Sequence, residues 1–500
     1  MNKVKYFLLL LLAATMMVSC SSTDENLRAM VPDDAVGIVA IDVPSILKKG
    51  GMKSAQEGTV KIPDELKKII DDGDPNIIAD VVGNLPTSGF DFTSRYYIFL
   101  SPGIYKCVAL IPLSNQEQAI KMVSKIASEK MKEVGGVNYA SHLDYGFAID
   151  GDVLLIGRFS NAVSPEAGAK AAADILDKSK PSILDNKEVA KVIDNKQGDV
   201  NAYINVKNLG SLIKSETRVN TLLGGIQAIE LFAESGINAM TATISFDMSK
   251  KDGEIAKMKT QFICDKNGHY SQLYDNVVLA KADSAATVLQ LVPGDELNTY
   301  LGLRVDGSKL AQMPQMKTLY ELLESNALTR GLNFKDIFSS IDGPLVVGMG
   351  RAQVADFNLA VAMHTNNPGM ITDQVLNVAS ARGQEPMDLD GEYYYEHGNQ
   401  GIALGETDKA FYLRMVDFEA RYSADDQLVF EYNLDKCVVT FLRYLKIGQN
   451  MEGTFNWGLT DKTNGGAIYF AENPKANVVI SILKLLCWKE PKSTTDDSQG

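Results

Sequence analysis

The chain has 500 residues, of which 45% are hydrophobic and 22% are charged, so it is neither a disordered polymer nor a protein of many membrane spans. At about 150 residues per domain, this length predicts two or three domains. The 63 acidic residues outnumber the 49 basic ones and give a formal net charge of −14. This balance argues against a nucleic-acid partner, because binding to phosphates needs a dense basic surface.

The first twenty residues have the pattern of a secretion signal that ends in a cysteine. Two lysines precede an apolar run over 6–18, which is short of the roughly 20 residues of a permanent membrane helix. The run ends in Met17-Val18-Ser19-Cys20, which resembles the lipobox of bacterial lipoproteins. The resemblance implies removal of the signal peptide 1–19 and acylation of Cys20. The alternative is an ordinary secreted protein with a cysteine at its cleavage site.

Residues 20–27 are expected to form a short polar tether. Asp24 and Glu25 lie close to Cys20, and an acidic pair in this place resembles the surface-export signal of Bacteroidetes lipoproteins. A solvated linker has the same composition, so the sequence leaves open whether the protein faces the periplasm or the cell surface. The net negative charge argues against flat electrostatic adsorption to an anionic membrane surface, so we expect the lipid on Cys20 to provide the membrane attachment.

The second half of the chain repeats segments of the first half in the same order. Val31-Pro32 and a strand after it are matched by Val292-Pro293 and a second strand, and Gly89 is matched by Gly331. The later matched pairs are 108–111 with 359–362, 146–149 with 401–404, 202–206 with 429–434, and 243–246 with 454–457. Because chance matches would not stay collinear, the order predicts a tandem duplication. The alternative is two unrelated α+β domains of similar strand composition.

The predicted fold class is α+β, with two tandem duplicated modules that each form a mainly antiparallel sheet covered by helices. Strands with alternating apolar and polar residues, such as 202–206, favour a sheet with one covered face. In each module a helix is expected after a central strand, near 115–133 and 368–382. The modules are expected over 28–285 and 290–488, and the polar tail 489–500 is expected to be disordered.

Four cysteines remain after Cys20, and their spacing excludes a short metal-binding motif. In an oxidising envelope they permit three disulfide pairings, whereas their apolar neighbours favour buried free thiols. The sequence alone does not decide the disulfide state of these residues, which are Cys107, Cys264, Cys437 and Cys487.

No catalytic residue, metal site or cofactor can be assigned from motifs. The chain has no nucleophile elbow, no phosphate loop and no His-Glu-x-x-His. Gly348-Met349-Gly350 lacks the third glycine of a dinucleotide fingerprint and is interpreted as a turn. The acidic stretches 71–74 and 388–392 contain oxygen ligands that suit calcium, but they lack the spacing of a calcium loop and are interpreted as turns.

Histidines and a run of tyrosines are the remaining candidates for chemistry. We expect none of the four histidines to recur at equivalent positions of the two modules, which favours structural roles over acid–base catalysis; they are His142, His269, His364 and His397. Tyr393-Tyr394-Tyr395 places neighbouring rings on opposite faces of a strand, where they fill a core or, alternatively, stack on a glycan.

The lipobox at Cys20, the two Val-Pro openings and the repeated modules together resemble a family of large lipoproteins from gut Bacteroidetes, described as a domain of unknown function. The resemblance implies an envelope location and supplies no catalytic residues. We therefore expect a lipid-anchored outer-membrane protein that is not an enzyme and that offers a binding or scaffolding surface to an unidentified protein or glycan. The alternatives are a carboxylate-dependent hydrolase acting on glycan or peptide, and a glycan-capture protein that uses rings near Tyr393-Tyr394-Tyr395 or Trp457.

Overall fold

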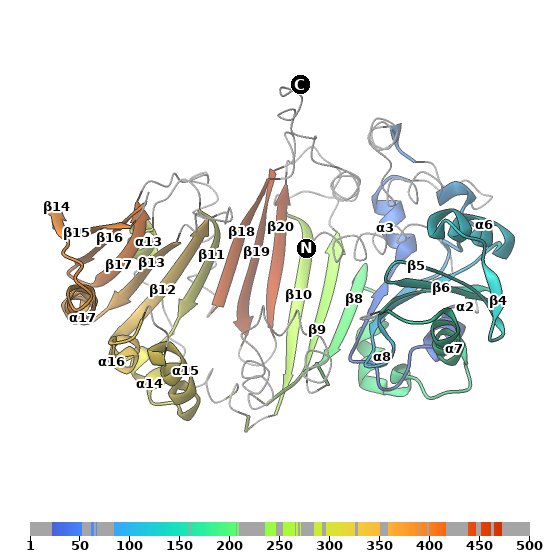
Figure 1. Cartoon of the computed structure of the whole chain (residues 1–500), viewed down its shortest axis with the longest axis horizontal. Helices are drawn as coiled ribbons and strands as arrows, with labels where there is room; N and C mark the ends of the chain where they lie inside the picture. Colours follow the sequence, from blue (N-terminus) through green and yellow to red (C-terminus); the bar gives the residue numbers. More distant parts are fainter. Residues whose placement is uncertain are drawn as a thin grey trace.

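The fold consists of α-helices and antiparallel β-strands (Figure 1). The structure, a computed structural model, describes residues 23–52, 62–64, 67, 85–159, 162–206, 208–209, 236–246, 254–265, 267–268, 271, 285–292, 297–325, 329–350, 359–389, 391–397, 400–416, 439–446, 452–461 and 465–472.

Ten strands of the first half pair in a fixed order, and every pair is antiparallel. From the outer edge inward they are β4 (Lys132–Val134), β5 (Val137–His142), β6 (Tyr145–Asp150), β7 (Val153–Phe159), β3 (Tyr105–Pro112), β2 (Tyr96–Leu100), β1 (Gly37–Ile41), β8 (Val200–Asn205), β9 (Ile237–Phe246) and β10 (Glu254–Cys264).

Ten strands of the second half pair in the corresponding order. From the other outer edge inward they are β14 (Met387–Leu389), β15 (Glu392–His397), β16 (Gln400–Thr407), β17 (Ala410–Val416), β13 (Leu359–Thr365), β12 (Ile341–Gly350), β11 (Leu297–Arg304), β18 (Val439–Lys446), β19 (Glu452–Asp461) and β20 (Gly465–Glu472).

The two ten-stranded antiparallel halves join edge to edge through their last strands. β10 pairs antiparallel with β20, with Lys257 opposite Tyr469 and Met258 opposite Ile468. All twenty strands of the described residues therefore belong to one continuous sheet, with β4 and β14 at its two ends.

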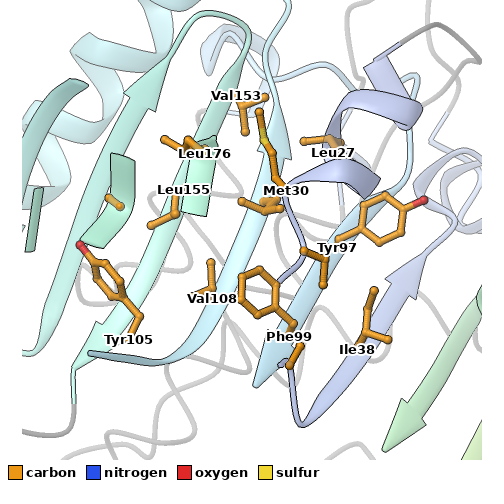
Figure 2. Packing of buried hydrophobic residues seen from close by; sticks show 14 of the residues in the cluster. Leu27, Met30, Ile38, Tyr97, Phe99, Tyr105, Val108, Val153, Leu155 and Leu176 are labelled. Carbon is orange, nitrogen blue, oxygen red and sulfur yellow. The ribbon is translucent and has the colours of Figure 1, made fainter. Parts of the chain in front are cut away.

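Helices cover both faces of the sheet in the first half. On one face, α2 (Thr23–Ala29), α7 (Pro165–Leu176), the 3₁₀ turn η2 (Ile183–Asp185) and α8 (Lys187–Ile193) bury side chains against Tyr97, Phe99 and Leu110. Figure 2 shows Leu27 of α2 and Leu176 of α7 in this cluster with Tyr97 and Phe99. On the other face, α3 (Val43–Lys49) and α6 (Gln116–Ala127) pack on Ile98 and Ile156, and the 3₁₀ turn η1 (Leu85–Thr87) adds Leu85. The expectation of one exposed face is therefore wrong for these strands, and β7 is buried along almost its whole length.

In the second half, α13 (Ala285–Gln290) packs on β12 and β13, and α17 (Pro368–Ser380) packs on the opposite face over β16 and β17. Three further helices pack on one another beside β12: α14 (Gly307–Ala311), α15 (Pro314–Ser325) and α16 (Phe334–Ser339). Figure 1 shows the labelled helices at the two ends, with β9, β10 and β18 to β20 between them. Helices thus cover the sheet only in part, which corrects the expectation of sheets covered by helices.

The helices expected after the central strands are present. An asparagine caps the N-terminus of each, since the Asn115 side chain accepts from the Gln118 backbone in α6 and that of Asn367 from the Met370 backbone in α17. α6 ends at Ala127, earlier than expected, because Ser128 takes a left-handed conformation with φ of 57°.

Two local expectations are wrong. The stretch expected to be a tether is helical from Thr23 onward, and Leu27 is fully buried under the sheet. Gly348 to Gly350 do not form a turn, because they are the last residues of β12 and pair with β11. The signal peptide, Cys20, the segment 429–434 and the tail 489–500 lie outside the described residues.

Candidate functional site

The polar cluster that we single out lies on one face of the second half and joins three side chains of β15 and β17. Tyr412 Oη donates to Glu392 Oε1 at 2.6 Å, and Arg414 Nη2 donates to Oε1 and Oε2 of the same carboxylate at 2.7 and 2.9 Å. The Arg414 guanidinium also lies over the Tyr412 ring, 5.7 Å from its centre. We call these residues the Glu392 cluster.

Strand register and a glycine bring the Glu392 cluster together. Tyr412 pairs with Gly405 on the intervening strand β16, and a side chain at Gly405 would meet Tyr412 Oη at 2.4 Å. The missing side chain therefore lets the Tyr412 ring lie across β16 and reach Glu392. Arg414 is two residues after Tyr412, so it points to the same face of the sheet.

The cluster favours an ionised carboxylate beside a neutral phenol. Partial burial acts to raise the pKa of Glu392, but hydrogen bonds from Tyr412 and Arg414, together with the charge of Arg414, outweigh it and hold the pKa below its ordinary value. Burial, followed by the hydrogen bond to Glu392, raises the pKa of Tyr412 to about 12. A carboxylate in this state is poorly suited to exchange protons near neutral pH.

We expect Glu392→Gln to lower the pKa of Tyr412 toward its ordinary value of 10.0, because the phenol loses its charged acceptor. The folded pKa of Glu392 lies below the ordinary value of 4.5, so the carboxylate stabilises the fold above that pH and this contribution is lost as the pH falls through the folded pKa. The variant should lose this acid-sensitive part of its stability. Carbon NMR of ring-labelled tyrosine, assigned with Tyr412→Phe, and denaturant unfolding across the acid range measure the two effects.

Asp388→Asn is the matched control, because the Asp388 side chain accepts from the Gly391 backbone at 3.3 Å and not from Tyr412. This variant should leave the titration of Tyr412 unchanged. An unaltered Tyr412 titration in Glu392→Gln would contradict the assigned pairing.

The corresponding positions of the first half are apolar. The hairpins match, because His142 pairs with Tyr145 and His397 with Gln400, and each histidine ends the first arm. By this match Glu392, Tyr412 and Arg414 stand where the first half has the residues Val137, Val153 and Leu155, which are buried in the core beneath α7. The second half therefore has polar and charged side chains at positions where the first half has buried apolar side chains.

The same match corrects the expectation about histidines, since His142 and His397 do occupy equivalent backbone positions. His364, on β13, is paired instead with Asp342, with its Nδ1 2.5 Å from the carboxylate oxygen. His269 lies outside the described residues.

A second polar network holds the first half together. The carboxylate of Asp199, with a side chain only 3% exposed, accepts from Lys49 Nζ at 2.6 and 2.8 Å, Ser45 Oγ at 2.6 Å and the Phe246 backbone at 2.6 Å. It thereby ties α3 to the start of β8 and the end of β9. We call these four residues the Asp199 network.

Nearby ion pairs extend this network to α2 and α8. Arg28 binds Asp194, and Arg95 lies 3.6 Å from Asp194 and 4.0 Å from Asp42. These charges connect secondary-structure elements to each other, which is a structural role.

The acidic stretch 388–392 is interpreted from the sequence as a turn, but Asp388 lies within β14 and Glu392 begins β15, with Gly391 between the strands at a φ of 89°. Asp390 lies outside the described residues. The last carboxylate of the stretch turns away into the Glu392 cluster. The stretch 71–74 lies outside the described residues, within which no group of three or more His, Cys, Asp or Glu side chains is arranged to hold a metal ion.

The tyrosine run behaves as strand aromatics that fill a core. Tyr393 and Tyr395 pack beneath α17, whereas Tyr394 lies on the other face, where its ring would meet any side chain at Gly401. Trp457 pairs with Phe441 and Ile468 in the central strands.

Cys107 and Cys264 are free thiols, and burial raises the pKa of Cys107 to about 12 and also raises that of Cys264. Such thiols are poor nucleophiles near neutral pH. Cys437 and Cys487 lie outside the described residues.

Sequence reasoning named Glu392 as part of an acidic turn but missed Tyr412 and Arg414. Their spacing of two residues within a strand was the available signal, because it places both side chains on one face. Among the described residues, no helix is long and apolar enough to cross a membrane.

Two crystal forms of one solved structure are remotely similar to the chain. Crystal form I of TP0453 overlaps 47% of this chain and 77% of TP0453, with 12% sequence identity and a TM-score of 0.26. Crystal form III overlaps 39% of this chain and 96% of its own, with 11% identity and a TM-score of 0.20. Similarity at this level supports no conclusion about function, and no curated protein matches the chain in sequence.

A family model matches most of the chain. It is described as a domain of unknown function, DUF4836, and covers residues 27–420, from the buried Leu27 of α2 to just beyond β17. The match includes the Glu392 cluster. The chain therefore belongs to the DUF4836 family.

Proposed function

We propose that the protein is a lipid-anchored protein of the bacterial outer membrane that offers a binding or scaffolding surface and is not an enzyme. The proposal that it is not an enzyme rests on one observation: the carboxylates of the Glu392 cluster and of the Asp199 network are already paired with other groups of the protein. Both oxygens of Glu392 are bound by Arg414, and the buried Asp199 is bound by Lys49, Ser45 and a backbone amide. Carboxylates held in this way stabilise contacts between strands and helices instead of serving as free acids or bases.

The anchor is proposed from Cys20 and the lipobox before it. Helix α2 begins at Thr23 and is fixed to the sheet, because Tyr97 Oη donates to Asp24 at 2.8 Å and Leu27 is buried. This contact also gives Asp24 a structural role. Asp24 is thus explained in two ways, by its contact with Tyr97 and by the proposed signal for surface export.

We also infer that the halves descend from one duplicated module. Three observations support this: the ten strands of each half pair in the same order, the side chains of Asp42 and Asp306 cap α3 and α14 alike, and a tyrosine lies against a glycine in both halves. The last pairs are Tyr139 with Gly146 and Tyr394 with Gly401. The Glu392 cluster then marks where the second copy diverged, and we place the binding surface on that face.

Cys20→Ser is expected to abolish acylation and leave the precursor uncleaved, because the lipid is transferred to the Cys20 thiol before the signal peptide is removed. The measurement is mass spectrometry of the N-terminal peptide, with palmitate labelling, in a bacterium that processes lipoproteins. Cys264→Ser is the matched control and should keep its label. Acylation that persists in Cys20→Ser would overturn the anchor, and protease shaving of intact cells distinguishes the surface from the periplasm.

A further inference from the structure

The junction between the halves pairs two strands that hold the same place in each half. β10 and β20 are each the last strand of their half, and they lie side by side and antiparallel (Figure 1). We followed the pairing register from strand to strand, starting at His142 in one half and His397 in the other. It gives Met258 of β10 the same place as Ile468 of β20. These two residues lie directly opposite each other at the junction.

This junction has the form of a contact between two identical subunits. A local two-fold axis relates the equivalent antiparallel strands and passes through the pair of Met258 and Ile468. A two-fold contact between subunits uses the same surface on both sides. The hydrogen bonds of such a pair come from backbone groups, so β10 of a second copy could take the place of β20 in the same register. The match follows from strand pairing and does not require a common origin of the halves.

Two lysines distinguish the pairing within the chain from the pairing between copies. Lys257 and Lys259 are two residues apart on β10 and therefore lie on one face of the sheet. Within the chain they lie opposite Tyr469 and Ala467, which carry no charge near neutral pH. In a pair of two β10 strands centred on Met258, Lys257 of each copy would lie opposite Lys259 of the other. Like charges directly opposite each other destabilise an antiparallel pair.

The neighbouring strand places no carboxylate opposite these lysines. On β9 the residues opposite Lys257 and Lys259 are Ser245 and Thr243, which are both neutral. The side chain of Lys259 is exposed. Two β10 strands would therefore bring four ammonium groups together on one face, whereas the pair of β10 and β20 has two.

The order of the chain gives β10 an opportunity to meet a second copy. β10 ends at Cys264 and β20 begins at Gly465, about 200 residues later. Domains generally fold as units, with the N-terminal one first during synthesis. A first half that folds in this order presents β10 before its own β20 exists. During that interval, the strand of identical geometry is β10 of another copy.

We propose that β10 is a self-association site that fits a second copy of this chain, and that Lys257 and Lys259 reserve it for β20 of the same chain. The two charges disfavour the pair of β10 strands and leave the pair of β10 with β20 unaffected. Removal of both charges should therefore let two chains join through β10.

The test refolds the chain from residue 21 onward, which carries no lipid, from denaturant under reducing conditions. Size-exclusion chromatography with light scattering measures the dimer fraction. We expect Lys257→Thr/Lys259→Thr to form several-fold more dimer than the unsubstituted chain, because threonine suits a strand and has no charge. Lys178→Thr/Lys196→Thr is the matched control, which removes two exposed lysines from turns and should leave the dimer fraction unchanged. Equal dimer fractions in the two double variants would overturn the proposal.

An added cysteine identifies the strand through which the dimers form. Met258→Cys is combined with Lys257→Thr/Lys259→Thr, because residue 258 would face its own copy at a Cα separation of about 5 Å, which a disulfide can bridge. Mild oxidation should then give a covalent dimer that the double variant without the added cysteine does not give. Dimers that fail to cross-link would show a different contact and would contradict the proposal.

A charge-preserving variant separates charge from the shape of the lysine side chains. Lys257→Arg/Lys259→Arg keeps both positive charges, so we expect the refolded chain to stay monomeric in the same chromatography. Dimer formation equal to that of the threonine variant would show that charge does not control the pairing, which would also refute the role of the two lysines.

Discussion

Asp199→Ala is expected to lower the free energy of unfolding by about 3 kcal/mol, the range for removing one member of a buried charge pair. The substitution leaves the Lys49 ammonium, the Ser45 hydroxyl and the Phe246 amide without their shared acceptor. Denaturant unfolding at neutral pH, monitored by circular dichroism, measures the change. The loss should affect the junction of α3 with β8 and β9 first.

Asp174→Ala provides the matched control. Asp174 also pairs with a lysine, Lys180, at 3.0 Å, but both side chains are about half exposed. Exposed pairs contribute little, so we expect a change below about 0.5 kcal/mol. Equal effects of the two substitutions would show that burial of Asp199 does not matter and would refute the role assigned to it.

Gly307→Ala is expected to destabilise the second half by about 3 kcal/mol, at the upper end of overpacking effects. Gly307 begins α14, where a side chain would lie 1.9 Å from the Phe338 carbonyl and 2.7 Å from that of Ile341. Both atoms belong to the backbone, so neither can move aside without shifting α16 or β12. Thermal and denaturant unfolding measure the effect.

Gly369→Ala is the same substitution at another helix start, but we expect it to have the opposite effect on stability. Gly369 lies in α17, and the nearest atoms to an added side chain are the Glu406 carboxylate oxygens at 3.7 and 3.8 Å. Alanine favours the helix over glycine, so we expect a stabilisation of up to about 1 kcal/mol. If Gly307→Ala were equally neutral or stabilising, the close packing of α14 on α16 would be wrong.

The sequence predicted several elements well, because hydrophobic periodicity is local. The helices expected near 115–133 and 368–382 are α6 and α17, and the matched segments 146–149 and 401–404 lie in the paired strands β6 and β16. The pairing of β10 with β20 was beyond this reasoning, since it joins residues about two hundred positions apart and depends on backbone groups that every residue has.

The proposed repeat also shows where matching of apolar letters fails. The segments 108–111 and 359–362 were aligned one residue out of step. Leu110 lies on the face covered by α2, whereas its assigned partner Val361 packs on the face covered by α17. Side chains alternate along a strand, so a shift of one residue exchanges the faces although the letters still agree. A similar limit hid the Glu392 cluster, because Arg414 lies 22 positions from Glu392 and meets it only through the strand register.

The way in which the halves join has a consequence for solubility. An unpaired strand edge is a template for growth by further strands, and proteins guard such edges against aggregation. Here β10 has eleven residues and β20 has eight, and the two strands pair with each other. Each of these long edges is therefore hydrogen-bonded within the chain and is closed to further strands. Within the described residues, the two edges that stay open, β4 and β14, are three residues long and offer little to an incoming strand.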